Sequence, residues 1–345
     1  VQYIRLGNSG LKVSRFSLGA MSFGDPKLQS YGGSWVVGKE EAFKVLKRAW
    51  DLGINFFDTA NVYSKGKSEE IIGEFANEIG REEVVIATKV YFPIGSGIND
   101  YGLSRKHIMR SVKESLKRLK TDYIDLYQTH RWDDTTPIEE TLFTLTELVR
   151  QGIVRYIGTS SMWGWQLAKI YFTAEYKGYE KPISIQTPYN LLYREEEREI
   201  IPFCKAHNIA YLAYSPTAIG LLSGKYFKDG KIVIPPDATE RLRPGSSYYG
   251  YKIYVEPMEE NSEIIKRVIE VAKNKGVTPT QIAIAWLLHK DVIPIIATSK
   301  IEHLEEDVEA LNIKLSSDEI KYIEEPYKPK PVAHITKAQI PSELL

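Results

Sequence analysis

The sequence predicts an α/β protein in which eight parallel strands close into a (β/α)8 TIM barrel. Short runs rich in β-branched and aromatic residues alternate with amphipathic stretches of helical period, which is the pattern of parallel βα units. Eight such runs favour a closed barrel over an open sheet. No Gly-x-Gly-x-x-Gly turn follows an early strand, so a Rossmann dinucleotide site is not indicated. We expect residues 1–345 to form one domain.

The expected strands take their places along the chain in order, each followed by a helical stretch. They are Arg15–Ala20, Asn55–Thr59, Val84–Lys89, Ile124–His130, Val154–Ser160, Ser184–Thr187, Ala210–Ser215 and Ile293–Thr298. Ahead of the first strand, Asn8-Ser9-Gly10 separates two short strand-like pieces within residues 3–13. This predicts an N-terminal hairpin that could plug the bottom of the barrel.

The predicted helices carry local start and stop signals. The stretch Lys39–Leu52 has a stripe of apolar residues and ends before Gly53, as an amphipathic helix with a C-terminal glycine should. Thr136 with Glu139 predicts a capping box at the start of a helix that Gly152 closes. These features belong to the architecture of the fold and not to its chemistry.

Two stretches are too long for ordinary connections and predict long loops on the active face. They are Val90–Leu103, rich in glycine and proline, and Thr217–Glu260, which holds two proline-rich turns and several tyrosines. Long loops in compact domains are usually functional or mobile. The second stretch is alternatively a small inserted subdomain, although it has few periodic apolar residues.

Charge and composition exclude several classes of partner. Forty-five basic residues balance 45 acidic ones, so no global field attracts nucleic acid or an anionic membrane, and any bound anion must be held locally. The only cysteine, Cys204, is expected to be a small buried hydrophobe in a reducing compartment. Neither a signal peptide nor a membrane-length apolar run is present, so we expect a cytoplasmic protein, monomeric by default. The six histidines lack metal-ligand spacing, and no metal is expected.

Four polar residues are expected at the active face, where the carboxyl ends of barrel strands meet. Asp58, Lys89 and His130 end three neighbouring strands, and Tyr63 follows Asp58 by five positions. A buried lysine needs a partner such as Asp58, and its cation would lower the pKa of Tyr63 from the usual ~10 toward that of a general acid. Singly, such residues are more often structural. Together they favour proton donation to a carbonyl that accepts a hydride.

These residues lie in motifs that resemble those of the aldo-keto reductase superfamily. The matching runs are Phe57-Asp58-Thr59-Ala60 with Tyr63, Thr88-Lys89, and Leu126-Tyr127-Gln128-Thr129-His130. The resemblance extends from Leu6 to about Val332. It implies that Tyr63 is the general acid, that Lys89 and Asp58 activate it, and that His130 orients the substrate. The segment from Glu324 to Val332 is similar to the aryl-alcohol dehydrogenase and ketone reductase branch.

The same resemblance implies NADP(H) as the cofactor and three groups of residues that hold it. The nicotinamide is assigned to Ser160, Ser161 and Gln186, with Tyr214 stacking on the ring. The pyrophosphate is assigned to Ser215, Thr217, Gly220, Leu221 and Lys225, helped by either Arg241 or Arg243. The 2′-phosphate and adenine are assigned to Ser299, Lys300, His303, Glu306 and Asp307. A lysine at position 300 favours NADP over NAD because its charge needs a phosphate partner.

Two positions depart from the family pattern, because asparagine is usual where this chain has Ser161 and Asp307. A serine hydroxyl reaches less far than an amide, and a carboxylate lacks the amide's donor, which puts both contacts in doubt.

The substrate is expected to be a small carbonyl compound or alcohol, in a pocket lined by Met21, Tyr91, Trp132 and Trp163. Two other functions stay open. The chain is alternatively a nucleotide-binding regulatory subunit with little turnover, since potassium-channel β subunits resemble the same superfamily. A lyase or isomerase with Lys89 as a Schiff-base amine is the third reading, which the nearby Tyr63 and His130 disfavour.

Overall fold

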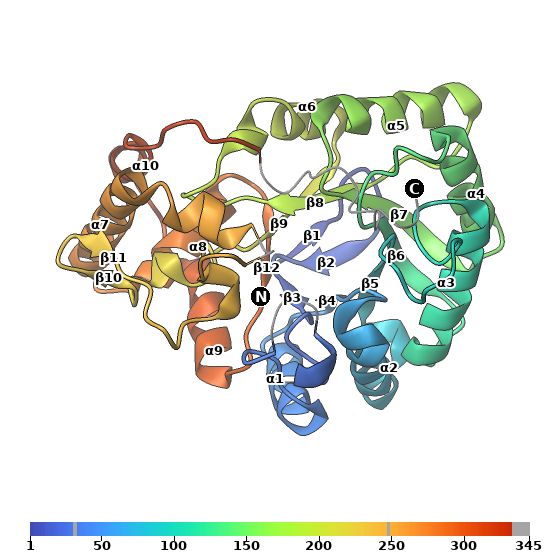
Figure 1. Cartoon of the computed structure of the whole chain (residues 1–345), viewed down its shortest axis with the longest axis horizontal. Helices are drawn as coiled ribbons and strands as arrows, with labels where there is room; N and C mark the ends of the chain where they lie inside the picture. Colours follow the sequence, from blue (N-terminus) through green and yellow to red (C-terminus); the bar gives the residue numbers. More distant parts are fainter. Residues whose placement is uncertain (30–32, 247–248, 333–345) are drawn as a thin grey trace.

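The computed structural model describes residues 1–29, 33–246 and 249–332, and these form a closed barrel of eight parallel strands. Around the barrel the strands are β3 (Ser17–Gly19), β4 (Phe56–Asp58), β5 (Val85–Val90), β6 (Ile124–Thr129), β7 (Val154–Ser160), β8 (Ser184–Pro188), β9 (Ala210–Tyr214) and β12 (Ile293–Ile296). Strand β12 pairs with both β9 and β3, which closes the ring (Figure 1). Each predicted strand overlaps one of these, so the predicted (β/α)8 barrel is confirmed.

Helices form the outer layer of the barrel (Figure 1). They are α1 (Lys39–Asp51), α2 (Lys67–Ile79), α3 (Arg105–Leu119), α4 (Ile138–Arg150), α5 (Gly164–Lys177), α6 (Ile200–His207), α7 (Met258–Lys275), α8 (Pro279–His289), α9 (Ile301–Glu309) and α10 (Ser317–Glu324). Helix α1 buries Val45, Leu46 and Ala49 against the barrel, as its apolar stripe predicts. Within the described ranges, no helix combines the length and the hydropathy needed to cross a membrane.

The predicted capping box at the start of α4 is wrong. The helix begins at Ile138 with Pro137 at the N-cap position, and no side chain caps it. The hydroxyl of Thr136 instead donates to Oδ2 of Asp133 at 2.7 Å. Asp133 lies three residues earlier in the same loop after β6, so a different local contact has replaced the capping box.

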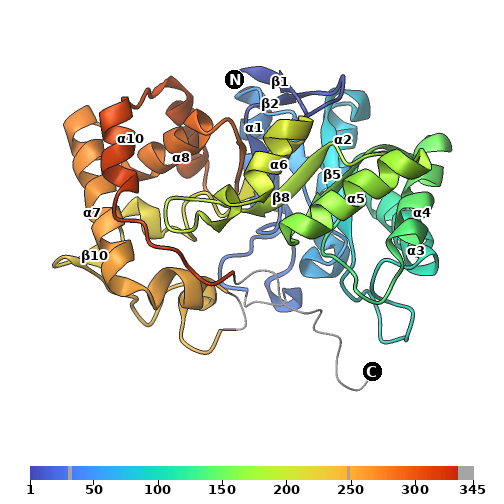
Figure 2. The ribbon, with the colours of Figure 1, turned by 90° about the horizontal axis from the view of Figure 1, so that it is seen from above.

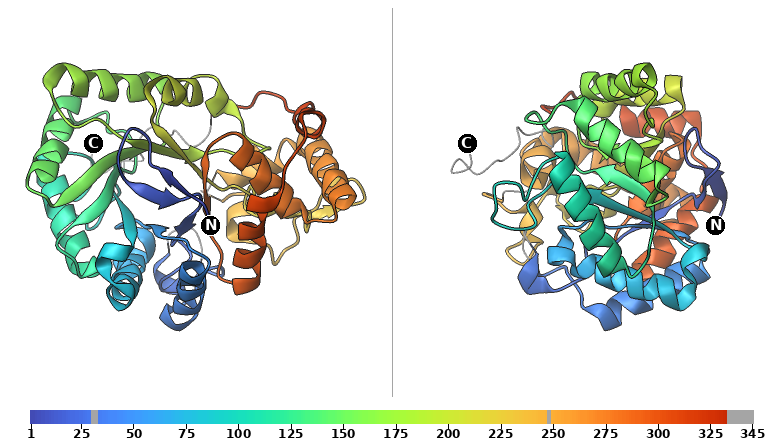
Figure 3. Two further views of the ribbon diagram at one scale, coloured as in Figure 1. Left: turned by 180° about the vertical axis from the view of Figure 1, so that it is seen from behind. Right: turned by 90° about the vertical axis from the view of Figure 1, so that its right-hand side faces the viewer.

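The N-terminal hairpin of β1 (Tyr3–Arg5) and β2 (Lys12–Ser14) closes one end of the barrel. Leu6 and Val13 pack with the inward side chains of the strands in one buried cluster. At Gly7, where φ is +55°, a Cβ atom would lie 2.2 Å from the carbonyl oxygen of Ile183, so only glycine fits this approach. The hairpin therefore plugs the barrel, at the top of Figure 2 and in front of the strands in the left view of Figure 3.

The inward-facing side chains of the strands change from apolar to polar toward the end of the barrel opposite the hairpin. In β5 the inward residues are Val85, Ala87 and then Lys89, and in β4 Phe56 is followed by Asp58. The register places Asp58 beside Ala87 on the next strand. The upper layer of the barrel therefore gathers charged side chains that the lower layers shield from water.

The two predicted long loops lie at the polar end of the barrel. Residues 91–104 link β5 to α3 without a helix or strand of their own. Residues 215–257 contain a small hairpin, formed by β10 (Phe227–Lys228) and β11 (Lys231–Ile232), and several short helical turns. Helix α7 begins at Met258, slightly before the predicted end of the loop at Glu260. The buried loop residues Leu242 and Tyr254 join the main core. The loop therefore packs into the core of the barrel.

Candidate active site

A cavity of about 1390 Å³ opens at the carboxyl ends of the strands. Most of the predicted site residues line it: Met21, Asp58, Tyr63, Tyr91, His130, Trp132, Ser160, Ser161, Trp163, Gln186, Tyr214, Ser215, Thr217, Gly220, Lys225, Arg241, Ser299, Lys300, His303, Glu306 and Asp307. Lys89 lies behind Asp58, fully buried. Leu221 is buried in the core, and Arg243 donates to the carbonyl of Ala238 and does not line the cavity.

Lys89 makes three hydrogen bonds at the inner wall of this cavity. Its Nζ donates to Oδ1 of Asp58 at 2.5 Å, to the carbonyl oxygen of Thr59 at 2.8 Å, and to the hydroxyl of Tyr63 at 3.3 Å. Burial lowers the pKa of Lys89, and the Asp58 carboxylate opposes that shift. An amine held by three oxygens in this way is poorly placed to attack a substrate carbonyl, which disfavours the Schiff-base reading.

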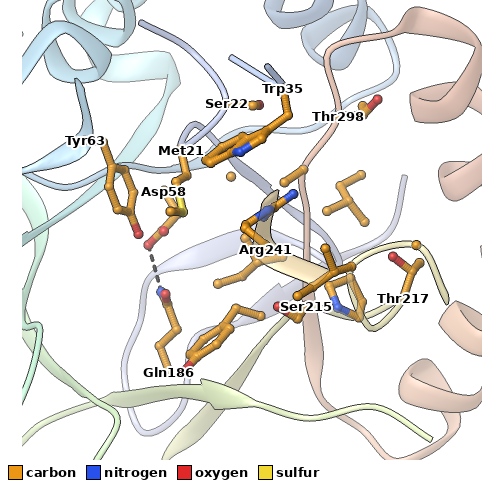
Figure 4. A pocket seen from close by; sticks show the side chains of 18 of the residues that line it. Met21, Ser22, Trp35, Asp58, Tyr63, Gln186, Ser215, Thr217, Arg241 and Thr298 are labelled. Carbon is orange, nitrogen blue, oxygen red and sulfur yellow. Dashed lines mark hydrogen bonds between the residues drawn. The ribbon is translucent and has the colours of Figure 1, made fainter. Parts of the chain in front are cut away.

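The second oxygen of Asp58 also accepts two hydrogen bonds. Gln186 Nε2 donates to Oδ2 at 2.8 Å, drawn as the dashed line in Figure 4, and Gln128 Nε2 donates to it at 3.1 Å. The buried carboxylate is therefore surrounded by donors on both oxygens. Such a group keeps its charge in a dry site and fixes the position of Lys89.

His130 follows the last residue of β6, and its imidazole is buried. The ring packs edge-on against Tyr63, with the ring centres 5.9 Å apart, and against Phe92 at 4.8 Å. Burial, aided by the cations of Arg131 and Lys89, holds the pKa of His130 well below its usual value. The imidazole is therefore neutral at physiological pH, which suits a hydrogen-bond donor more than a general acid.

The backbone around Tyr63 is strained. The two residues after it, Ser64 (φ +46°) and Lys65 (φ +51°), and then Gly66 (φ +90°), lie in the left-handed region before α2 begins. Such conformations cost on the order of 1–3 kcal/mol for a residue with a side chain and cluster at functional sites. This turn aims the half-buried phenol of Tyr63 at Lys89.

The residues expected to hold a nicotinamide lie together on β7, β8 and β9. The hydroxyl of Ser161 is 3.3 Å from that of Ser160 and 3.2 Å from that of Tyr214. Gln186 uses its Nε2 on Asp58, whereas its Oε1 has no partner within the described chain. That oxygen faces the cavity as a free acceptor, so this wall fits a ligand that carries an amide donor.

The loop after β9 has a shape suited to anions. Positive φ angles at Ser215 (+53°), Ala218 (+51°), Ile219 (+59°) and Gly220 (+85°) produce a chain of tight turns beside the cavity. Successive backbone N–H groups in such turns form concave surfaces that bind anions in other proteins. Lys225 follows on the same wall, and in the described part of the chain it forms no ion pair.

Arg241 belongs to the long loop, and it reaches the cavity where Arg243 does not. Its guanidinium lies over the ring of Trp35, with the central carbon 4.2 Å from the ring centre. Figure 4 shows this pair between Tyr63 on one side of the cavity and Thr217 on the other. The loop after β3 and the loop after β9 therefore meet across the middle of the cavity.

The far end of the cavity is built from the residues after β12 and the start of α9. Lys300 precedes this helix, and no ion pair of Lys300 occurs within the described ranges. Asp307 is buried, and burial with the neighbouring Glu306 charge raises its pKa to about 8. Asp307 is therefore mostly protonated at neutral pH, and a protonated carboxyl supplies one donor, as the usual asparagine would.

Several residues in and behind the cavity wall are absent from the sequence prediction. Gln128 is buried behind the wall on β6, two positions before His130, so the period of two could have found it. Arg131 directly follows His130, and the chain position alone marks it as near the site. Trp35, Phe92 and Tyr249 come from loops, and no periodicity in the sequence indicates where their side chains lie.

Among the described residues, no three His, Cys, Asp or Glu side chains lie close enough together to bind a metal ion. Cys204 is buried, and burial raises the pKa of its thiol. This agrees with the expected role of a small core residue.

The sequence and the structure were compared with those of known proteins, and the matches include aldo-keto reductases. The model of the aldo/keto reductase family matches residues 15–328. "Putative aryl-alcohol dehydrogenase AAD16" of Saccharomyces cerevisiae is 42% identical over 351 residues, covering 96% of this chain and 98% of that protein. Versiconal hemiacetal acetate reductase of Aspergillus parasiticus is 39% identical, with 96% and 98% covered. The crystal structure of the thermostable aldo-keto reductase Tm1743 is similar with a TM-score of 0.74 at 30% identity, covering 95% of this chain and all of that one.

Proposed function

Because this chain belongs to the aldo/keto reductase family, and so is an oxidoreductase that uses a nicotinamide cofactor, we propose that it reduces aldehydes or ketones with NADPH and that Tyr63 donates the proton. The observation that carries this proposal is the contact of the buried ammonium of Lys89 with the Tyr63 hydroxyl at 3.3 Å. A cation at that distance favours the phenolate that remains after proton donation.

The cavity wall fits the cofactor. The free Oε1 of Gln186 and the hydroxyls of Ser160 and Ser161 would hold the carboxamide, and Tyr214 would flank the ring. The turns after Ser215 would hold the pyrophosphate, and the other phosphate and the adenine would lie along the residues after β12. Lys300 is the reason for proposing NADP over NAD, because its charge lacks a partner in the described chain and a 2′-phosphate would supply one. When bound, the reduced nicotinamide supplies the hydride.

The chain's own residues would then act in sequence on the carbonyl oxygen. His130, neutral because of its burial, donates a hydrogen bond that orients the carbonyl beside Tyr63. Tyr63 gives its proton to the oxygen as negative charge develops there. Lys89 stabilises the phenolate, and Asp58 keeps the lysine charged and in place. In the reverse direction the phenolate takes the proton of an alcohol.

Replacement of Tyr63 with phenylalanine tests this role directly. Oxidation of NADPH with benzaldehyde as substrate should fall by about 100- to 10,000-fold, the usual contribution of a general acid. The affinity for NADPH, followed by fluorescence quenching, should stay unchanged because only the hydroxyl is removed. Tyr123→Phe removes a phenol outside the cavity and is the matched control.

A Tyr63→Phe variant with turnover close to that of the wild type would refute the assignment of the proton donor. Tight NADPH binding by the wild type without turnover of any aldehyde in a broad panel would instead favour the nucleotide-binding regulatory subunit.

A further inference from the structure

Arg131 stands on the cavity wall next to His130, and the proposed reaction does not use it. It is partly buried, and its Nη1 donates to the carbonyl oxygen of His130 at 2.7 Å. The central carbon of the guanidinium lies 5.2 Å from the ring centre of Phe92, and that ring contacts the imidazole of His130. The side chain is therefore held in one orientation beside the reacting position.

No carboxylate of the described residues neutralises this arginine. The two nearest acids in the chain are committed elsewhere. Asp134 is exposed and accepts from the indole Nε1 of Trp132 at 2.7 Å. Asp133 accepts two hydrogen bonds at each oxygen, from donors on Leu103, Thr135 and Thr136.

Two other partly buried arginines, Arg118 and Arg81, are paired with carboxylates. Arg118 donates to the buried carboxylate of Glu69 at 2.6 Å, and Arg81 donates to that of Asp125 at 2.7 Å. In Arg131 only Nη1 has a partner within the described chain, so the edge formed by Nε and Nη2 is free. That edge is the one that binds a carboxylate through two parallel hydrogen bonds.

The surroundings of Arg131 indicate what accompanies the carboxylate. Phe92 packs against Arg131, Tyr91 packs against Phe92, and the rings of Trp132 and Trp163 also line the cavity. Flat apolar walls select an aromatic or otherwise flat apolar body, and a few placed polar groups fix its orientation. A ligand with an aromatic ring and a carboxylate would satisfy both features.

We propose that Arg131 is a specificity residue that binds the carboxylate of the substrate, and that the preferred substrates are aromatic aldehydes or ketones carrying a carboxylate group. The inference rests on the proposed carbonyl reduction and names its substrate class. Arg131 also contributes its charge to the neighbourhood of His130, so a purely electrostatic role is the competing explanation. The two roles differ because an electrostatic effect acts on every carbonyl substrate, whereas carboxylate binding acts only on charged ones.

The test compares 4-carboxybenzaldehyde with its methyl ester, which differ in charge and share the ring and the aldehyde. The wild type should prefer the acid in kcat/KM, and Arg131→Met should reduce the ratio of acid to ester by about 10- to 100-fold, through a higher KM for the acid. Arg131→Lys should restore part of the ratio, because a lysine keeps the positive charge but lacks the two parallel N–H donors of the guanidinium. Arg150→Met removes a charge on the exposed face of α4 and should keep the wild-type ratio.

A second readout keeps the inference separate from the proposed function. Binding of 4-carboxybenzyl alcohol to the complex with NADP⁺, followed by calorimetry, should depend on Arg131 in the same way. If neither aldehyde is reduced but this binding is lost in Arg131→Met, the proposed reaction is refuted and the carboxylate site stands. The inference is overturned if the wild type reduces both aldehydes without preferring the acid, if Arg131→Met lowers kcat/KM for acid and ester equally, or if Arg131→Met binds the alcohol as tightly as the wild type does.

Discussion

Replacement of Asp58 with asparagine should destabilise the protein through its effect on Lys89. Three donors converge on the Asp58 carboxylate: Lys89 on Oδ1, and Gln128 and Gln186 on Oδ2. An asparagine has one acceptor oxygen and one NH2 group. Its NH2 group would therefore face either Lys89 or the two glutamine amides, which are donors themselves. The ammonium of Lys89, 0% exposed, would also lose its counter-charge.

The size of the effect follows from the protonation of Lys89. A buried ammonium without a counter-charge releases its proton, which from the ordinary pKa of 10.5 costs at most about 5 kcal/mol at about pH 7, at about 1.4 kcal/mol for each pH unit, because burial already lowers the pKa in the wild type. This agrees with the ~3–5 kcal/mol that breaking a buried ion pair costs. In the variant the folded pKa of Lys89 would lie below its unfolded value, so the unfolded chain binds one proton more. The stability of the variant should therefore rise with pH relative to the wild type.

Urea unfolding followed by tryptophan fluorescence measures this at about pH 6 and about pH 8. The free energy of unfolding of Asp58→Asn should be several kcal/mol below that of the wild type at the lower pH, and the gap should narrow at the higher pH. Lys89→Met is the matched control. It removes the amine whose protonation is proposed to change, so its gap should not narrow as pH rises. A gap below about 1 kcal/mol, or one independent of pH, would refute the account of the pair.

Two further predictions concern the far end of the cavity. Because the pKa of Asp307 is raised to about 8 in the folded protein, the folded chain binds a proton that the unfolded chain lacks between the ordinary carboxyl pKa and that value. Stability without cofactor should fall as pH rises through this window, and urea unfolding of Asp307→Asn should show a flatter profile, by up to about 1.4 kcal/mol per pH unit. If the wild type and Asp307→Asn show the same dependence of stability on pH, the raised pKa of Asp307 is refuted. Lys300→Met should raise the KM for NADPH by about 10- to 100-fold and change that for NADH little, and steady-state kinetics giving equal changes would refute the phosphate contact.

The strands and the inner site residues could be predicted because local sequence determines both. A short apolar run such as Val85–Val90 is typical of a buried strand. A charged residue near the carboxyl end of such a strand is expected at the mouth of the barrel. The positions of Asp58, Lys89 and His130 at the strand ends therefore predict that the three side chains lie together. The hairpin was equally local, since its turn residues stand between two short strands.

What escaped prediction depends on how the loops fold. The capping box at Thr136 failed because the loop turns its hydroxyl to Asp133, three residues earlier, and Arg241 reaches the cavity over the ring of Trp35 whereas Arg243 does not. Leu221 lies within the correct loop, yet its side chain turns into the core. Loop conformation decides each of these cases, and sequence period carries no information about it.

Under the proposed function, the distribution of charge inside the cavity would let a chain of zero net charge select anions. Lys89, at the proposed reaction centre, is paired with Asp58, and burial holds the pKa of His130 beside it well below its usual value. Arg131, at the substrate wall, and Lys300, at the far end, form no ion pair within the described residues. If the reaction centre itself carried a net positive charge, a substrate carboxylate would bind there and exclude the carbonyl. Pairing the inner lysine and leaving the outer cations unpaired places each anion away from the atoms that react.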